Sequence, residues 1–319
     1  MNAYIGKQLN LSHCKVIVFS ERVAFGGIEK EIYSLINNVQ IRPSTNLVIS
    51  KCDAYTYIEN SKPSLENLTS KYYEIFPSSG KYTGYTYDAT IGDFFNNLVS
   101  YNSEPFAILG GLSTLNADSA YNNSQEETSH IKSNNTPISG KRGAENIGLA
   151  VFKDGYLIGE LNAMETICFS VIKNKVDTFL ITIPDPQNEG NFLDIYIYPK
   201  VDAKANISII NGNPYIEFSS KFEGKITSMQ SNSDYLSNEV LDLISDNVNN
   251  YLESMFYSYL YKTSIEFNSD INGFGRYSLN NYSTLQEFED YNWLSNYKNS
   301  VFKIKFKTKI QSGMLLTKT

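Results

Sequence analysis

The spacing of apolar residues near the start of the chain predicts a buried strand, a helix and a second buried strand. Residues 15–20 and 46–50 are short, almost continuous apolar runs, which are typical of strands covered on both faces. Residues 21–38 between them have helical spacing, interrupted at Gly26 and Gly27. Since a strand-helix-strand unit usually forms a parallel pair, we expect an α/β domain here.

Two hairpins are predicted further along the chain. Asp154-Gly155 separates apolar segments within 147–159, and Asn211-Gly212 separates alternating segments at 203–210 and 215–226. Both dipeptides suit the positive φ angles of tight hairpin turns. A short helix at 161–169, followed by strands near 169–172 and 178–183, is expected between the two hairpins.

The last quarter of the chain combines a long amphipathic helix with an alternating strand. The predicted helix begins after Ser237, a good N-cap, and carries apolar residues at three- and four-residue steps. These residues are Leu241, Ile244, Val248, Tyr251 and Met255. An extended stretch at 264–267, a polar helix at about 283–297 and a strand at 302–310 should follow. We expect an antiparallel sheet covered by the long helix.

The fold class predicted from this order is α+β, with mixed sheets and packed helices in two to three domains. Residues 116–143 are too polar to form a core and predict a linker or long loop. The other predicted regions are an N-terminal α/β domain at 1–115, incomplete at its start, a middle hairpin and strand region at 144–186, and a C-terminal α+β domain at 187–319.

Asp270 with Gly273, Phe274 and Gly275 is the sharpest local motif. One interpretation is a recognition turn that contacts a partner subunit. The other, which we favour, is a structural turn in which the glycines take unusual backbone angles, Asp270 caps the backbone and Phe274 enters the core. It is not a dinucleotide fingerprint, because the third glycine is missing.

A basic row alternates with apolar residues and one threonine in the final strand. Its members are Lys303, Lys305, Lys307 and Lys309. The row could meet anionic lipid or an acidic partner. It could equally protect an edge strand from pairing with another sheet. The sequence leaves both interpretations open.

Composition argues against most catalytic and nucleic-acid functions. The net charge is −7, with no basic cluster typical of nucleic-acid binding. The two histidines have no partner at catalytic or metal-ligand spacing, and the three cysteines lie far apart. We therefore predict a protein that is not an enzyme and has no cofactor and no metal. Two other classes stay open: a carbohydrate- or peptidoglycan-binding module, suggested by 24 tyrosines, and a hydrolase that uses paired carboxylates.

Membrane attachment is not encoded in the sequence as given. No apolar run approaches the ~18 residues that a spanning helix needs. Cys14 follows a histidine and no charged-then-apolar leader, so it does not resemble a lipid-attachment site. We expect a chain that is soluble as given.

Three segments together resemble the spore germinant receptor C subunits, the GerAC-like lipoproteins. The first contains Glu21, Ala24, Gly27 and Arg42 before the strand at 47–50, and the second contains the hairpin that ends near Leu161 with Glu165-Thr166 after it. The third is the C-terminal series of long helix, Asp270 motif, Trp293 helix, alternating strand and Gly313. The resemblance covers most of the chain.

This resemblance implies a non-enzymatic protein of bacterial spore germination. In that family the C subunit is a lipoprotein on the outer face of the spore inner membrane, where it works with integral membrane A and B subunits in nutrient signalling. The chain would then be the ectodomain, or most of it, without the N-terminal lipid anchor and the first strands. Asp270, Gly273, Phe274, Gly275, Trp293 and Gly313 are the candidates for a structural or interface motif.

The chain departs from the family pattern at three places. Leu285 stands where a second aromatic residue is usual, Tyr297 stands for phenylalanine, and Gln311-Ser312 replaces basic residues before Gly313. The first two changes keep apolar bulk in the helical region, so the expected fold is unaffected. They put the transfer of interface details in doubt.

Overall fold

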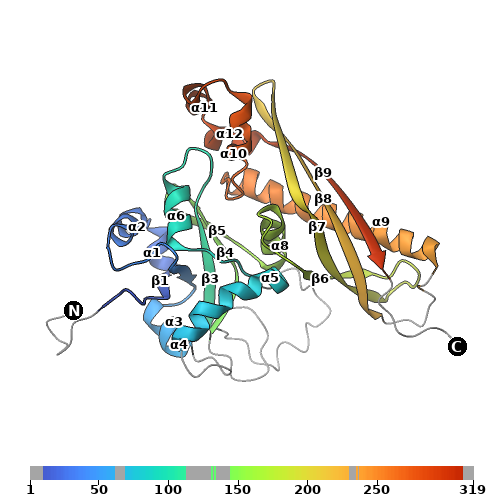
Figure 1. The fold of residues 1–319 in the computed structure, drawn as a ribbon, viewed down its shortest axis with the longest axis horizontal. Helices are drawn as coiled ribbons and strands as arrows, with labels where there is room; N and C mark the ends of the chain where they lie inside the picture. The colour runs from blue at the N-terminus through green and yellow to red at the C-terminus, as the bar shows by residue number, and fades with distance from the viewer. Residues whose placement is uncertain are drawn as a thin grey trace. The chain divides into compact units, whose positions relative to one another are not determined.

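The computed structural model describes residues 10–61, 69–112, 131, 133, 144–229, 235 and 237–311 (Figure 1). The chain divides into two compact units. The first comprises Met1–Ser78 and Thr86–Ala163, and the second comprises Ser79–Tyr85 and Met164–Thr319. Each unit has its own sheet, so the predicted α+β class with mixed sheets and packed helices is confirmed.

The first unit is built on a five-stranded mixed sheet in the order β1-β2-β3-β4-β5. Its strands are β1 (Val16–Ser20), β2 (Asn46–Ser50), β3 (Phe106–Leu112), β4 (Ala144–Lys153) and β5 (Tyr156–Leu161). The pairs β1-β2 and β2-β3 are parallel, as expected from the strand-helix-strand pattern, whereas β4 and β5 add antiparallel strands. In β2 all five residues are buried, which explains its continuous apolar sequence.

Short helices connect the parallel strands of this sheet. They are α1 (Glu21–Phe25), α2 (Glu29–Ile36), α3 (Ala54–Asn60), α4 (Thr69–Ile75), a 3₁₀ turn at Phe76–Ser79 and α6 (Ile91–Leu98). Asp53 caps α3, and Thr90 with Asp93 forms a capping box on α6. The core includes Ile32, Phe94 and Phe152.

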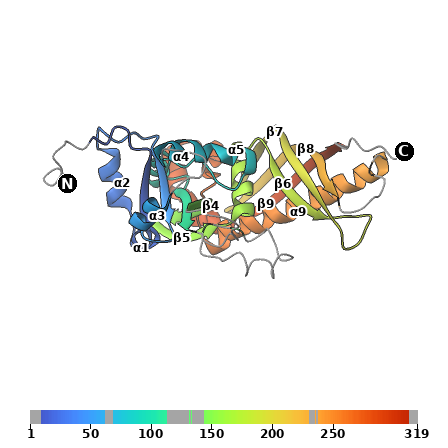
Figure 2. The same ribbon diagram turned by 90° about the horizontal axis from the view of Figure 1, so that it is seen from below.

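The second unit contains a four-stranded sheet in the order β6-β7-β8-β9. Its strands are β6 (Phe179–Pro184), β7 (Phe192–Ile210), β8 (Asn213–Met229) and β9 (Val301–Gln311). Its helices are α5 (Gly80–Thr83), α8 (Ala163–Ile172), α9 (Asn238–Tyr261), α10 (Gly275–Ser278), α11 (Leu285–Tyr291) and α12 (Trp293–Asn296). The long helix α9 runs beside β9 in both views (Figures 1 and 2).

One strand direction differs from the expected antiparallel arrangement. β6, β7 and β8 are antiparallel to their neighbours, but β9 pairs with β8 in parallel, from Tyr215↔Val301 to Lys225↔Gln311. The physical reason is the connection. The chain leaves β8, runs back along α9 and its following turns, and enters β9 from the same end, as a parallel pair requires.

Both predicted hairpin turns are present. Asp154 and Gly155 have φ angles of 50° and 79°, and Asn211 and Gly212 have 51° and 81°. These positive angles match the right-handed twist of the flanking strands. The Asn-Gly turn joins β7 and β8, each of which is longer than the alternating segment predicted for it, 203–210 and 215–226.

Three local predictions are wrong. Residues 264–267 fall within and just after a π-helical turn, Lys262–Glu266, and are not extended, while 169–172 belong to α8 and are not a strand. The helix expected at 283–297 is broken at Asn292, which has a φ of 51° and caps α12 with its side chain. In each case a side-chain or tertiary contact overrides local propensity.

The predicted middle region at 144–186 is shared between the two units. Its hairpin, β4 and β5, lies in the first sheet, and its later part supplies α8 and β6 to the second unit. The predicted linker at 116–143 lies outside the described residues, apart from Ile131 and Ser133. The Ser133 hydroxyl donates to the Leu109 carbonyl in β3 at 2.9 Å.

Candidate interaction sites

Asp270 is placed by the sharp turn that follows α9. Its Oδ1 accepts a hydrogen bond from the Phe274 N–H at 3.1 Å, and its Oδ2 accepts one from the Gly275 N–H at 2.9 Å. Gly273 has a φ of 71°, a backbone angle that favours glycine. The motif therefore forms a capped turn, and Phe274 is fully buried in the core.

Trp293 completes this site from α12. Its Nε1–H donates to Asp270 Oδ2 at 2.8 Å, and the indole is buried. The structure thus joins four predicted residues of the turn with the predicted tryptophan. Gly313, the last member of the predicted set, lies outside the described residues.

The electrostatic environment of Asp270 is dominated by burial. Burial raises the pKa of Asp270 above its ordinary value, and the three N–H donors and the charge of Lys173 only partly oppose this. Both oxygens are already engaged by N–H donors, and the side chain has no exposed surface. The carboxyl is positioned to fasten α12 and the turn together, not to meet a substrate.

A buried polar network surrounds this turn. The Lys173 ammonium donates to the Asn272 carbonyl at 2.8 Å, and the Tyr259 hydroxyl donates to Asn272 Oδ1 at 2.8 Å. The hydroxyls of Thr263 and Tyr297 lie 3.0 Å apart. Because these residues come from α9, the turns that follow it and the position just after α8, the network locks the C-terminal end of α9 in place.

The basic row lies on β9, and every lysine in it is exposed. Ile304, Phe306 and Ile310 alternate with the lysines and are buried against α9, together with Thr308. Lys303 donates to Glu217 on β8 at 2.6 Å, and this hydrogen bond raises the pKa of Lys303. The strand therefore has one core face and one charged face, as predicted.

The outer edge of β9 is closed by side chains of α9. Four backbone N–H groups of β9 donate to side-chain oxygens that are spaced four residues apart on the helix. The hydrogen bonds run from Ile304 to Tyr257 Oη (3.1 Å), from Phe306 to Glu253 Oε1 (3.0 Å), from Thr308 to Asn249 Oδ1 (2.8 Å) and from Ile310 to Ser245 Oγ (3.2 Å). Four helical residues advance about 6 Å and two strand residues about 6.6 Å, so the two repeats match.

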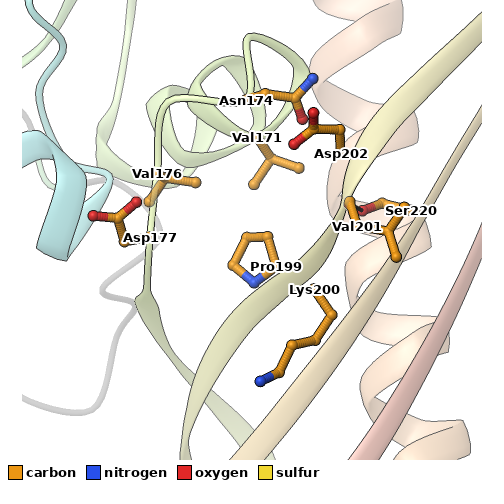
Figure 3. A pocket seen from close by; sticks show the side chains of 9 residues that line it. All are labelled: Val171, Asn174, Val176, Asp177, Pro199, Lys200, Val201, Asp202 and Ser220. Atoms are coloured by element: carbon orange, nitrogen blue, oxygen red, sulfur yellow. Dashed lines mark hydrogen bonds between the residues drawn. The ribbon is translucent and has the colours of Figure 1, made fainter.

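A cavity that the sequence did not predict lies at an irregularity of β7. It encloses about 360 Å³ and is lined by Val171, Asn174, Val176, Asp177, Pro199, Lys200, Val201, Asp202 and Ser220 (Figure 3). Asn174 pairs with both backbone groups of Ala203, at 2.7 and 3.3 Å, where the register of β7 shifts. The Ser220 hydroxyl donates to the Val201 carbonyl, and Lys200 pairs with Glu223 at 2.7 Å. These polar groups are used within the protein.

The first unit contains a partly buried ionic cluster around Lys51. Lys51 follows β2 and pairs with Glu21 and Glu160, each of them largely buried. Burial lowers the pKa of Lys51, but the two carboxylates outweigh it, and the net result is a raised pKa. Lys51 is thus held protonated as a structural cation, which makes it unsuitable as a general base.

The remaining candidate chemistry is sparse in the part of the chain that the structure describes. There, no group of three His, Cys, Asp or Glu side chains is arranged to hold a metal ion, and no helix is long and apolar enough to cross a bilayer. Burial raises the pKa of the Cys168 thiol, so it is not an activated nucleophile. The carboxylate pairs Glu287/Asp290 and Asp242/Asp246 are exposed on helices, as expected.

Comparison with known proteins gives matches over both units. Residues 147–313 match the family model described as "Spore germination B3/ GerAC like, C-terminal", and residues 1–109 match "Spore germination protein N-terminal domain". A solved structure titled "Crystal Structure of the GerBC protein" is similar, with a TM-score of 0.66 and 17% sequence identity. The similarity covers 93% of this chain and 79% of that one. No curated protein sequence matches the chain.

Proposed function

Because the chain belongs to the GerAC-like family of spore germination proteins, we propose that it is a non-catalytic subunit of a nutrient germinant receptor. The observation that carries this proposal is the order of the two family models. They match the N-terminal and C-terminal parts of one chain in sequence, and the fold similarity to the GerBC protein extends over 93% of it.

The proposed mode of action is protein-protein contact at the spore inner membrane. The integral membrane A and B subunits are the proposed partners, and the full-length protein would be held on the outer face of that membrane by an N-terminal lipid anchor. The hydrogen bonding at the C-terminal end of α9 supports a contact role. Asp270, Trp293 and the network around Asn272 fix the long helix, which suits a part that must present a constant surface.

The tyrosine content, which left a glycan-binding module open, has a structural explanation. Many tyrosines are buried and hydrogen-bonded, among them Tyr57, Tyr73, Tyr235, Tyr259 and Tyr297. These tyrosines serve packing and internal hydrogen bonding, and they give no support to a glycan ligand over a protein partner. Similarly, the exposed carboxylate pairs lie on helix surfaces and give no support to a hydrolase.

The proposal is tested by deleting the gene in a spore former that carries this receptor alone. We expect the spores to lose germination with nutrients while a trigger that bypasses nutrient receptors still works. An affinity-tagged full-length chain should restore the response and co-purify two multi-pass membrane proteins from spore membranes. A normal nutrient response in the deletion strain, or a tagged chain that recovers neither membrane protein, would overturn the proposal.

A further inference from the structure

The outer face of the second sheet carries a wide field of lysines. Residues directly opposite one another in paired strands share a face, so the registers of β7, β8 and β9 define rows across it. Three such rows are Lys204–Ser219–Lys305, Val201–Lys221–Lys307 and Tyr196–Lys225–Gln311. We name the seven lysines of this surface the lysine face: Lys204, Lys221, Lys225, Lys303, Lys305, Lys307 and Lys309.

Acidic side chains on the same face do not neutralise this field. Glu217 lies opposite Lys303 and forms an ion pair with it. Glu223 lies opposite Lys309, but its ion pair is with Lys200. Among the described residues, the other six lysines of the lysine face form no ion pair. A chain with a net charge of −7 thus concentrates unpaired positive charge on one sheet surface.

Protection of the sheet edge does not account for these lysines. Four N–H groups of β9 that face away from β8 already donate to Ser245, Asn249, Glu253 and Tyr257 of α9. Lys221, Lys225 and Lys204 lie on the interior strands β7 and β8, where edge protection is not needed.

The arrangement fits a bilayer surface better than an acidic protein. The charges are spread over three strands about 4.8 Å apart, on long flexible side chains, which suits a diffuse anionic surface. Tyr196, which is 38% exposed, and the half-buried Tyr198 lie on β7 beside the lysines, on the same face. Lysine with tyrosine is the combination favoured at the lipid-water interface.

We infer that the lysine face docks on an anionic phospholipid surface and orients the second unit against the membrane. The interaction is electrostatic, through lysine ammonium groups and lipid phosphates, and is therefore weakened by salt. The inference deepens the proposed function and rests on it only to identify the membrane as the spore inner membrane. Because vesicle binding is measured without the receptor, the docking inference and the proposed receptor function can fail independently.

The test is co-sedimentation of the purified chain with vesicles. One set contains phosphatidylcholine alone and the other contains phosphatidylcholine with phosphatidylglycerol. The face variant carries Lys305→Glu, Lys307→Glu and Lys309→Glu. The control variant carries Lys30→Glu, Lys175→Glu and Lys298→Glu, three exposed lysines outside the lysine face, so its net charge changes equally.

We expect the wild-type chain and the control variant to bind only the anionic vesicles, and the face variant to lose roughly 100-fold in partitioning. Circular dichroism should show all three chains equally folded. Failure of the wild-type chain to bind, binding to both kinds of vesicle, or equal losses in both variants would overturn the inference. Preferential binding to soluble polyglutamate over anionic vesicles would overturn it in favour of an acidic protein partner.

Discussion

The two sheets of this protein end in edge strands that are protected in different ways. β1 closes the first sheet with the sequence Val-Ile-Val-Phe-Ser, has no charged residue, and pairs with β2 on one side. β9 closes the second sheet, has alternating lysines, and its outward N–H groups donate to α9. An apolar strand with free edge groups is a template for pairing with another strand, whereas a covered edge is not.

Lysines on an edge strand can protect the edge or contact an outside partner, and the difference between β1 and β9 distinguishes these two roles. Because α9 satisfies the N–H groups of β9, the stability and solubility of that edge do not depend on its lysines. The lysines are then available for an outside partner, which is the role we infer for them. For β1, neither charge nor side-chain acceptors on a helix give comparable protection among the described residues, so this edge is open to a further strand.

The largest effect on the second unit is expected from loss of the Asp270 carboxylate, which holds the turns at the C-terminal end of α9. Asp270→Ala would leave the N–H groups of Phe274, Gly275 and Trp293 buried without their acceptor. We expect the unfolding free energy to fall by about 3–5 kcal/mol. Urea denaturation measures it. The matched control is Asp246→Ala, an exposed carboxylate on α9, and equal losses in the two variants would contradict the role of Asp270.

The covered edge itself is tested by removing two of its acceptors. Asn249→Leu with Glu253→Leu keeps similar side-chain volumes but leaves the N–H groups of Thr308 and Phe306 unpaired. The expected loss in unfolding free energy is about 2–4 kcal/mol, since each buried donor without a partner costs about 1–3 kcal/mol.

In this double variant, self-association should also increase with concentration, because an edge has been opened. The control is Asn250→Leu with Glu239→Leu, at exposed positions of the same helix. Sedimentation velocity that shows equal association for the two double variants would argue against edge covering by α9.

A stabilising substitution is expected within β9. The Thr308 hydroxyl is buried and has no hydrogen-bond partner among the described residues. Thr308→Val removes a buried polar atom at nearly constant shape, and its backbone N–H keeps the bond to Asn249. We expect the unfolding free energy to rise by about 1 kcal/mol. A loss of stability on denaturant unfolding would show that the hydroxyl is satisfied.

The stability of the second unit should depend on pH through Asp270. Burial raises its pKa in the folded protein above the ordinary 3.8. An acid with a raised pKa adds to stability below its ordinary pKa, and this contribution is lost as the pH rises through the folded value. The unfolding free energy of wild type minus that of Asp270→Asn should therefore decrease with rising pH. A difference that grows with pH would contradict the raised pKa.

At the open edge of β1, a charge placed in the strand should oppose pairing with another strand. Val18 is half-exposed in β1, between Ile17 and Phe19, which pack against the core. Val18→Lys is expected to change the unfolding free energy by about 0.5 kcal/mol or less. It should lower self-association measured by light scattering, while Lys307→Val on the covered edge should not raise it. Unchanged association in Val18→Lys would show that the β1 edge does not pair.

Much of the local structure could be predicted from the sequence because its signals are local. The Asp154-Gly155 and Asn211-Gly212 turns, the Ser237 cap and the alternation in β9 depend on nearby residues. The parallel direction of β9 does not depend on nearby residues, because it is set by how far α9 and its turns carry the chain before it returns. The break at Asn292 is not predicted either, because the apolar spacing continues across it.

The Asp270 site was only partly predictable. The sequence indicated a capped turn and a buried Phe274, but the hydrogen bond from Trp293 joins residues 23 positions apart and required the structure. The acceptors on α9 had a signal that could have been used. Ser245, Asn249, Glu253 and Tyr257 follow the buried residues Ile244, Val248, Leu252 and Phe256 by one position, giving a polar stripe beside an apolar one.

Native-state hydrogen exchange tests the comparison of the two edges most directly. The backbone amides of Ile304, Phe306, Thr308 and Ile310 lie at the end of a sheet, yet each has an acceptor on α9. We predict protection comparable to that of the interior strand β8, and faster exchange for outward amides of β1. Exchange of the four β9 amides at the rate of solvent-exposed groups would contradict a closed edge and the role assigned to its lysines.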